Sequence, residues 1–558
     1  MSTDEYLPSG SVLGVYGDVL GRTMKLPRSR RDGVRVERDL RVPMDDGVVL
    51  RADRYAPREA GPMPTVLVRT PYGRGGPYGL LYGLVYAQRG LQVLVQSVRG
   101  TFGSGGEFSP FDERADGLAT LRWIREQPWH EGKIGMAGAS YLGHVQWAVA
   151  RDAGSELGAI VPTVTASQFH GPTYGGGLAL QTMASWHTMI AVQEQPLAGL
   201  QMVRTLNRLR DAYRHLPLGE LDMKVLGRPS AHYRRALEAT ARDDPFWVTR
   251  DHAGTVADVE APVLLIGGWY DIFTPWQLED YAALRRAGRD VRLIVGPWTH
   301  VSRGLMAVST RESIRFLRAH LLGDERLLRR PRVHLHVGGA DEWRDYKDWP
   351  PPKSREWRLH LHAAGGLEPS DPQPSPPDRY RYDPEHPTPA FGGPVLLARK
   401  PVVDNRPLER RHDVLVYTTE PLGNGVEAIG PVHAEIFVRS SLEHFDVFVR
   451  VCDVDRLGVS RNVCDALERV TPEQVTRDAD GVARVAFSLW PTAHRFRRGH
   501  RIRVQVSSGA HPRYARNPGT GEPFASATRL VAADQEVLHD PDHPSAVTLT
   551  VVGPTPGA

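Results

Sequence analysis

A serine set among small residues is the first feature of this sequence that could do chemistry. Residues 135–144 are "GMAGASYLGH", with Gly138 two positions before Ser140 and Gly143 three positions after it. An apolar strand-like run precedes the serine and a helical run follows it. Strand, sharp turn and helix with a serine at the bend is the setting of a nucleophile elbow, whose hydroxyl attacks a carbonyl carbon. The spacing is G-x-S-x-x-G rather than G-x-S-x-G, and small residues also permit simple close packing.

A nucleophilic serine needs a base and a carboxylate that orients the base. The α/β-hydrolases supply these groups in the order Ser, Asp or Glu, His, from loops after later strands. Asp271 follows the run "LLIGGW" and His300 follows "LIVGPW", so each stands where a strand should become a loop. Either residue alone is explained as well by a surface loop, but three in this order favour a triad. We expect His144, one helical turn after Ser140, to pack or to hydrogen-bond locally rather than to act as the base.

The tetrahedral intermediate of acyl transfer also needs hydrogen-bond donors for its oxyanion. The backbone N–H of Tyr141, directly after the serine, is the expected first donor. A second donor should come from the loop after an early strand, where the chain has "RTPYG" and no HGGG run. The Tyr72 hydroxyl in this loop is one candidate, although Tyr72 could equally be a packed loop aromatic.

The elements that must position these residues alternate between β-type and helical runs. This alternation predicts a parallel sheet with helices on both faces, preceded by a β-hairpin around Asp46-Gly47. Strands are expected at residues 65–70, 91–100, 133–139, 261–269 and 291–298, and helices at 112–129, 141–150 and 276–288.

Two further regions depart from this alternation. Residues 178–216 are helical by periodicity and interrupt the α/β pattern, which predicts an inserted helical cap. After a proline-rich stretch, short β-type runs recur to the C-terminus, as in a sandwich or jelly roll. The expected parts are an N-terminal extension at 1–34, an α/β-hydrolase domain at 35–165 and 251–354, a helical cap at 166–250, and a β-sandwich (jelly-roll) domain at 355–558.

The motifs "RTPYG", "VRGTFGSGGEF", "GASYLG", "GWYD" and "GPWTH" occur in this order. Together they resemble the cocaine esterase / X-Pro dipeptidyl-peptidase-like (CocE/NonD) family of serine hydrolases. The later segments "EAIGPVHAEIFVRSS" and "HRFRRGHRIRVQVSSGAHPRYARNP" resemble the β-domain of the same family, so the likeness covers about residues 35–555. It implies an α/β-hydrolase fold with an inserted helical cap and a C-terminal all-β jelly roll.

The resemblance also implies roles for individual residues. Ser140 would be the nucleophile, His300 the base and Asp271 the residue that orients the base. The Tyr72 hydroxyl and the Tyr141 N–H would form the oxyanion hole. The aromatic acyl pocket of the family would correspond here to Tyr174, Trp186 and Phe273.

These residues predict a serine hydrolase that cleaves esters or amides of small to medium acyl groups through an acyl-enzyme. A carboxylic ester hydrolase is favoured, because esters demand less help for the leaving group. An X-Pro dipeptidyl-peptidase or α-amino-acid ester hydrolase is also compatible with the motifs, and it needs acidic groups for the substrate ammonium. Glu194 and Asp211 are candidates for these groups, and solvated surface charges are the simpler explanation. An acyltransferase that uses the same triad and a non-catalytic binding protein on a hydrolase scaffold complete the range of functions that the sequence allows.

Composition narrows the possible partners. The chain has 558 residues and a net charge of +4, with both signs interspersed and no basic run. We therefore expect a small-molecule ester or amide substrate, no nucleic acid and no membrane, while the sequence allows a homodimer and leaves the oligomeric state open. Neither Cys452 nor Cys464 has a second Cys or His at metal-ligand spacing, so no metal or other cofactor is expected and buried thiols are favoured over a disulfide. Without an apparent signal peptide or membrane span, a cytoplasmic location is expected.

Overall fold

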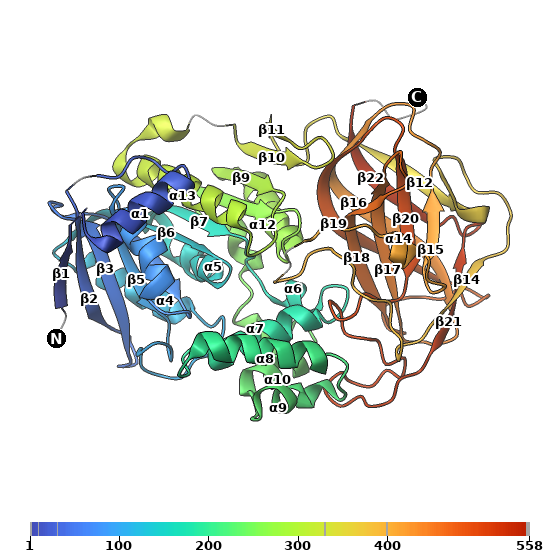
Figure 1. The fold of residues 1–558 in the computed structure, drawn as a ribbon, viewed down its shortest axis with the longest axis horizontal. Coiled ribbons are helices and arrows are strands. Elements are labelled where there is room, and N and C mark those ends of the chain that lie inside the picture. Colours follow the sequence, from blue (N-terminus) through green and yellow to red (C-terminus); the bar gives the residue numbers. More distant parts are fainter. Residues whose placement is uncertain (1–2, 9, 31, 329–330, 398–399, 554–558) are drawn as a thin grey trace. The chain divides into compact units, whose positions relative to one another are not determined.

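The computed structural model describes residues 3–8, 10–30, 32–328, 331–397 and 400–553. The chain forms two compact units (Figure 1). The first contains Met1–Phe169, Arg242–Gly268 and Trp276–Arg332, and the second contains His170–Ala241, Trp269–Pro275 and Val333–Ala558. These units group residues by packing, so the domain boundaries expected from the sequence stay a prediction.

The first unit is built on a twisted sheet whose strands follow the order β1-β2-β3-β5-β4-β6-β7-β8-β9. Strands β1, β2, β3 and β5 pair antiparallel in succession, and the pairs from β5 through β4 to β9 are parallel. The strands are β1 (Thr3–Leu7), β2 (Val34–Pro43), β3 (Val49–Pro57), β4 (Met63–Thr70), β5 (Gln92–Ser97), β6 (His130–Ala139), β7 (Leu157–Thr163), β8 (Val263–Gly268) and β9 (Val291–Gly296).

The local sequence explains this sheet. Strands β5, β7 and β8 are buried along their whole length, as parallel strands covered on both faces must be. The expected hairpin is confirmed between β2 and β3. Its turn contains Gly47 at φ 83°, and the Asp46 carboxylate accepts the N–H of Val48 at 3.1 Å.

Helices cover both faces of this sheet (Figure 1). Side chains three residues apart on a strand point to opposite faces. A Cβ placed on Gly135 would meet Leu317 of α13, whereas one placed on Gly138 would meet Leu142 of α5, so these two helices cover opposite faces. The helices that contain residues of this unit are α1 (Val12–Thr23), α2 (Gly76–Tyr78), α3 (Val85–Ala87), α4 (Arg114–Arg125), α5 (Tyr141–Ala153), α11 (Pro245–Val248), α12 (Thr274–Arg286) and α13 (Arg303–Leu322).

The second unit contains the helical insertion and the C-terminal β-domain. Backbone hydrogen bonds join the two, including Gln181 N–H to Pro512 C=O at 3.1 Å and Ala515 N–H to Leu178 C=O at 2.9 Å. The inserted helices are α6 (His170–Tyr174), α7 (Leu180–Val192), α8 (Ala198–Ala212), α9 (Leu221–Leu226) and α10 (Ala231–Glu238).

The β-domain strands follow the order β14-β21-β16-β22-β12-β13-β15-β20-β17-β18, and β19 pairs with β16. Apart from a parallel bridge between β13 and β15, the described pairings are antiparallel. The strands are β12 (Arg355–His362), β13 (Gly366–Glu368), β14 (Asp378–Tyr382), β15 (Leu415–Thr418), β16 (Val426–Ser440), β17 (Phe445–Val454), β18 (Ser460–Val470), β19 (Ala483–Phe496), β20 (Arg501–Ser507), β21 (Ala533–Leu538) and β22 (Ala546–Val552). The unit also contains the hairpin β10 (Val333–Val337) and β11 (Glu342–Tyr346) and helix α14 (Arg406–Glu409).

The expected fold class is confirmed: an α/β-hydrolase fold with an inserted helical segment and a C-terminal all-β jelly-roll domain. Alternate residues of the β-domain strands form a large apolar core that includes Phe445, Phe496 and Leu549. Cys452 and Cys464 are both buried and unbonded to each other. Over the described part of the chain, no helix is long and apolar enough to cross a membrane.

Candidate active site

Ser140 stands at a sharp turn between β6 and α5. Its backbone has φ 60° and ψ −122°, a conformation that costs a non-glycine residue free energy and is concentrated at functional sites. The turn is held because the Ser140 N–H donates to the Thr163 carbonyl at 2.9 Å, and the Ser140 carbonyl accepts the Gly143 N–H at 2.8 Å. The serine is only partly buried. This geometry is that of a nucleophile elbow.

The two glycines around the serine are required by space. A Cβ on Gly138 would lie 2.3 Å from the Leu142 Cβ, and a Cβ on Gly143 would lie 2.4 Å from the Thr165 Cγ2. Both distances are far shorter than any van der Waals contact. The small residues therefore permit the close packing that this sharp turn requires, and the role of Ser140 as a nucleophile stays a prediction.

Tyr141 begins α5 and directs its side chain into a buried polar network. Its hydroxyl donates to Glu113 Oε1 at 2.5 Å and accepts the N–H of Phe111 at 2.9 Å. Glu113 in turn pairs with Arg69 at 2.8 Å, and both of these side chains are almost completely buried. Burial and the neighbouring Glu113 charge hold the pKa of Tyr141 well above its usual value. The network fixes the first residue of α5, whose N–H is the expected oxyanion donor.

Glu113 and Arg69 compensate each other beneath the elbow. Burial raises the pKa of Glu113, while the Arg69 charge and the hydrogen bond from Tyr141 act in the opposite direction. Arg69 also donates to the Glu113 carbonyl at 3.0 Å and to Gln96 at 2.8 Å. A buried ion pair of this kind is strongly destabilised when one partner is removed. Sequence spacing offered no signal for this network, because Arg69 lies on β4, Glu113 directly precedes α4 and Tyr141 begins α5.

Tyr72 lies in the loop after β4, and β4 is the neighbour of β6 in the sheet. Its N–H donates to Thr70 Oγ1 at 3.0 Å. Its ring meets the Tyr141 ring edge to face, with centroids 6.4 Å apart, and stacks on Tyr78 at 5.5 Å. The same loop is anchored by Arg74, which donates to the Phe102 carbonyl at 2.6 Å. The structure thus brings the two expected oxyanion residues together.

His300 follows β9 in a loop that Trp298 packs against the sheet edge. A Cβ on Gly296 would lie 2.5 Å from the Trp298 ring, and one on Gly268 would lie 2.5 Å from the Trp298 carbonyl oxygen. The glycines of the "GGW" and "GPW" motifs therefore leave room for this tryptophan. Strands β7 and β8 separate β9 from β6, which carries Ser140 at its carboxyl end. His300 and Ser140 both follow carboxyl ends of parallel strands, as the sequence predicts.

Asp271 belongs to the second unit, three residues after the last residue of β8. It is 1% exposed. Its Oδ1 accepts the N–H of Phe273 at 2.9 Å. Its carbonyl oxygen accepts the Thr274 hydroxyl and the Trp490 indole N–H, each at 3.1 Å. The carboxylate is thus built into a buried, hydrogen-bonded loop.

The three expected pocket aromatics occupy different places in the second unit. Phe273 is buried beside Asp271. The Tyr174 hydroxyl donates to the Ala236 carbonyl at 2.8 Å at the end of α10. Trp186, on α7, is partly buried, and its ring lies 5.0 Å from that of His187. Their role in an acyl pocket stays a prediction.

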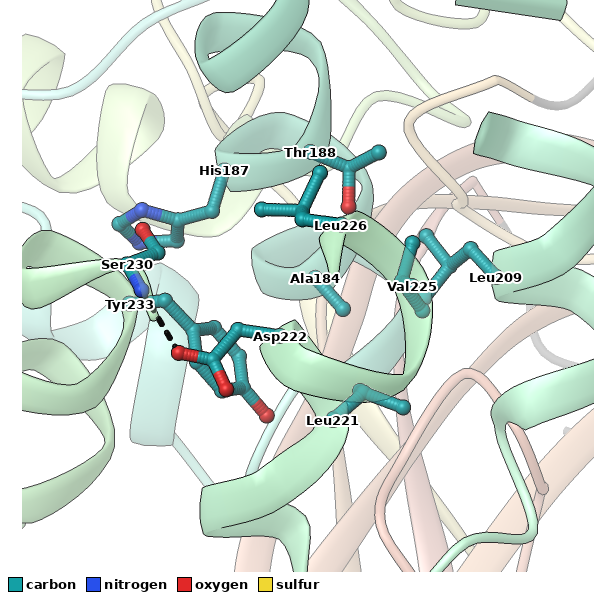
Figure 2. Close-up of a pocket in the computed structure, with 10 residues that line it drawn as sticks. All are labelled: Ala184, His187, Thr188, Leu209, Leu221, Asp222, Val225, Leu226, Ser230 and Tyr233. Atoms are coloured by element: carbon teal, nitrogen blue, oxygen red, sulfur yellow. Dashed lines mark hydrogen bonds between the residues drawn. The ribbon is translucent and has the colours of Figure 1, made fainter. Parts of the chain in front are cut away.

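A cavity lies within the helical insertion, between α7, α8, α9 and α10 (Figure 2). It has room for about one water molecule. None of the three expected pocket aromatics lines it. Its polar wall includes Asp222, whose carboxylate accepts the N–H of Ser230 at 2.7 Å and pairs with Arg234 at 2.8 Å. These bonds give Asp222 a structural role in joining α9 to α10.

His144 is confirmed as a packed residue. It is completely buried, and its ring lies edge-on to the rings of Phe111 and Phe169. Burial, assisted by the neighbouring His252, lowers the pKa of His144 to about 3. The imidazole therefore stays neutral at physiological pH. Among the described residues, no group of three His, Cys, Asp or Glu side chains is arranged to hold a metal ion.

Comparisons with known proteins match both parts of the chain. The family model described as X-Pro dipeptidyl-peptidase (S15 family) matches residues 46–302. The model described as X-Pro dipeptidyl-peptidase C-terminal non-catalytic domain matches residues 327–548. The cocaine esterase of Rhodococcus sp. (strain MB1 Bresler) is 33% identical over 570 residues, 93% of this chain and 98% of that protein. The chain belongs to the cocaine esterase / X-Pro dipeptidyl-peptidase-like family of serine hydrolases.

Solved structures agree on the fold of this family. An α-amino acid ester hydrolase labelled with selenomethionine has a TM-score of 0.78 at 23% identity, covering 95% of this chain and 98% of that one. An aminopeptidase from a marine sediment archaeon, Thaumarchaeota archaeon, has a TM-score of 0.77 at 24% identity, covering 92% and 96%. At these identities the likeness shows the fold alone. Membership of the family makes this chain a serine hydrolase, an esterase or a peptidase.

Proposed function

We propose that this serine hydrolase is a carboxylic ester hydrolase that acts on small to medium acyl groups. The observation that carries the proposal is Ser140 itself, a partly exposed serine held at φ 60° directly before the first turn of α5. Tyr72 and Tyr141 follow the carboxyl ends of the neighbouring strands β4 and β6, and their rings are in contact. In the proposed mechanism this is where donors to the oxyanion are needed.

In the proposed mechanism, His300 removes the proton of the Ser140 hydroxyl as its oxygen attacks the ester carbonyl. The negative charge that develops on the carbonyl oxygen is stabilised by the Tyr141 N–H and the Tyr72 hydroxyl. His300 then gives its proton to the departing alcohol, which leaves an acyl group on Ser140. Water, deprotonated by the same His300, attacks this acyl-enzyme and releases the acid. Asp271 holds His300 in the required orientation throughout.

An ester is preferred to an amide as substrate for a chemical and a comparative reason. An alkoxide is a better leaving group than an amide nitrogen, so an ester needs less assistance from the acid form of His300. The relative that is 33% identical is named a cocaine esterase. A pocket containing Phe273, Tyr174 and Trp186 would favour compact or aromatic acyl groups.

A peptidase is the second candidate, because the matching family model is described as an X-Pro dipeptidyl-peptidase. Such an enzyme must bind the ammonium group of its substrate with carboxylates. Asp211, one of the two acidic residues considered for this purpose, has a side chain 80% exposed beside Arg210, as expected of a solvated surface charge. The exposure of Asp211 gives the peptidase no support, so the ester hydrolase remains the first proposal.

A substrate panel separates these candidates. We would measure kcat/KM with p-nitrophenyl acetate, butyrate, octanoate and benzoate, and with Ala- and Gly-Pro-p-nitroanilides. The proposal predicts the highest values for short-chain or benzoyl esters and none for Ser140→Ala. A higher kcat/KM for an aminoacyl anilide would identify a peptidase. If 1-propanol speeds p-nitrophenol release and the propyl ester accumulates in place of acid, the enzyme is an acyltransferase.

The same proposal covers partners and location. The partner is a small-molecule ester or amide; nucleic acid and membrane are not part of the proposed function, and a homodimer is the assembly we would test for. A cytoplasmic location fits the two buried free thiols, Cys452 and Cys464, since reducing compartments keep thiols unpaired. Sedimentation of the purified protein and fractionation of the host cell test these points.

A further inference from the structure

A tryptophan of the β-domain is hydrogen-bonded to the residue that we propose as the acid of the triad. Trp490 lies on β19, 219 positions from Asp271 in the sequence. Its indole Nε1–H donates to the Asp271 backbone carbonyl at 3.1 Å. The contact therefore fixes the main chain of Asp271 rather than its carboxylate. Phe273 N–H holds the carboxylate itself at 2.9 Å.

The tryptophan is held in turn by a buried cation. The guanidinium carbon of Arg513 lies 5.0 Å from the centre of the Trp490 ring, within the range of a cation–π contact. Arg513 is 4% exposed, and its Nη1–H donates to Asp465 Oδ1. The arginine also donates to the Tyr514 hydroxyl at 3.2 Å. The Arg513 guanidinium is therefore held by hydrogen bonds to two neighbouring residues.

Asp465 joins this arginine to a second one. Its other carboxylate oxygen pairs with Arg450 at 2.8 Å, and both side chains are 1% exposed. Arg450 also donates to Asn405 Oδ1 at 2.7 Å. The cluster formed by Arg450, Asp465 and Arg513 is therefore a rigid, charged support, because moving any member leaves a buried charge without its partner.

We propose that Trp490 is a positioning residue for Asp271. Arg513 holds the indole ring in place, and the indole N–H fixes the position of the Asp271 main chain. The main-chain position in turn sets the direction from which the Asp271 carboxylate approaches His300. This inference rests on the proposed function, in which Asp271 orients His300. It gives an indirect part in catalysis to a region whose family model is described as non-catalytic. Displacements near 1 Å at such a site lower rates by up to about 100-fold.

Two replacements remove the N–H in different ways. Trp490→Phe removes the donor and one ring. Benzothienylalanine, introduced at position 490, replaces the N–H by sulfur and keeps the two-ring shape, so it tests the hydrogen bond even if the smaller ring disturbs folding. We expect kcat to fall about 10-fold in both, with KM changed less than threefold. Rates are expressed per site that reacts with a fluorophosphonate, which removes unfolded protein from the comparison.

The pH profile distinguishes positioning from simple destabilisation. A well-placed carboxylate raises the pKa of its histidine partner. Loosening Asp271 should therefore move the acid limb of kcat/KM to lower pH in both replacements. Trp357→Phe is the matched control, because Trp357 is a buried tryptophan on β12 of the same domain and contacts the apolar core. This control should lower the melting temperature and leave kcat per site and the acid limb unchanged.

Asp271→Asn separates failure of this inference from failure of the proposed function. One outcome is that Asp271→Asn lowers kcat by at least about 1000-fold, while both replacements at position 490 match the wild type in kcat per site and in the acid limb of kcat/KM. In that case the positioning role of Trp490 is wrong and the proposed triad stands. If Asp271→Asn keeps near-wild-type activity, Asp271 is not the orienting acid and both proposals fall. In the Asp271→Asn background, a positioning Trp490 should have no further effect on kcat.

Discussion

Tyr72 and Tyr141 meet edge to face, with ring centroids 6.4 Å apart and ring planes inclined by 72°. The Tyr141 hydroxyl is bonded to Glu113 and to the Phe111 N–H, so its side chain serves the interior, and in the proposed mechanism only its backbone N–H donates to the oxyanion. The contact between the rings therefore ties the loop after β4 to the start of α5. The two residues are expected to respond very differently to the same substitution.

Tyr72→Phe removes one hydroxyl and almost no volume. If that hydroxyl donates to the oxyanion, kcat should fall about 100- to 1000-fold, because a donor aimed at the developing charge contributes roughly 3–4 kcal/mol to the transition state. KM should change far less. Steady-state kinetics on one p-nitrophenyl ester measure both constants. A kcat within threefold of wild type would remove Tyr72 from the mechanism and make it a packing residue.

Tyr141→Phe should instead act on stability. The substitution takes a donor from the buried Glu113 and removes the hydroxyl oxygen that accepts the Phe111 N–H. Losing such a buried partner typically costs about 1–3 kcal/mol. The backbone N–H remains, so kcat per fluorophosphonate-reactive site should stay within about fivefold of wild type. Urea unfolding and active-site titration test this together; a large loss of kcat at unchanged stability would contradict it.

Gly143→Ala places a methyl group 2.4 Å from the Thr165 Cγ2. One of the two must move, and overpacking of this kind costs about 1–3 kcal/mol. Because Gly143 is in the first turn of α5, the shift should also displace the Tyr141 N–H and lower kcat. Gly199→Ala is the matched control, since Gly199 is helical and has nothing within 4 Å of the added methyl. Equal melting temperatures and activities for the two variants would show that the elbow tolerates the extra carbon.

Asp280 should make stability depend on pH. Its carboxyl is buried on α12 and contacts the Ser167 hydroxyl at 2.5 Å and the Ser167 N–H at 2.9 Å. Burial raises the pKa of Asp280 to about 8, although the bonds from Ser167 act in the opposite direction. In the unfolded chain the group titrates near its ordinary value of about 3.9.

Between about pH 4 and 8 the folded state therefore binds more protons at Asp280 than the unfolded state does. The free energy of unfolding must fall as pH rises through this window, by up to about 1.4 kcal/mol per pH unit from this group. Asp280→Asn removes that contribution, so its stability relative to wild type should improve steadily from pH 5 to 8. Denaturant titrations of both proteins at several pH values measure the difference. A difference that is constant with pH would show that Asp280 is already ionised in the fold.

Local sequence patterns predicted the parts of the site that follow strands. The apolar runs before Ser140 and His300 correspond to β6 and β9, and the glycines near each are explained by contacts of 2.3–2.5 Å with a hypothetical Cβ. The sequence patterns did not predict strand β7 or helix α13. The run "LGAIVPT" is short and ends in proline and threonine, and α13 mixes charged residues with apolar ones and even buries Glu312, so neither pattern is distinctive.

The supports of the site could not be predicted from the sequence. Glu113 stands among acidic residues at the start of a helix, where a solvated charge is the ordinary expectation. Only the fold shows it paired with Arg69, 44 positions away, and with Tyr141. Trp490 is still more distant from Asp271. Spacing along the chain carries no information about such contacts, because they depend on how whole elements pack.

The most direct test of the proposed nucleophile is to map the residue that forms a covalent adduct. Wild-type protein is treated with a fluorophosphonate, digested, and analysed by tandem mass spectrometry, with Ser140→Ala and a heat-denatured sample as controls. We predict one adduct per chain, on Ser140, with loss of ester hydrolysis in proportion to labelling and no adduct in either control. Stoichiometric labelling of a different serine, or full ester hydrolysis by Ser140→Ala, would contradict it.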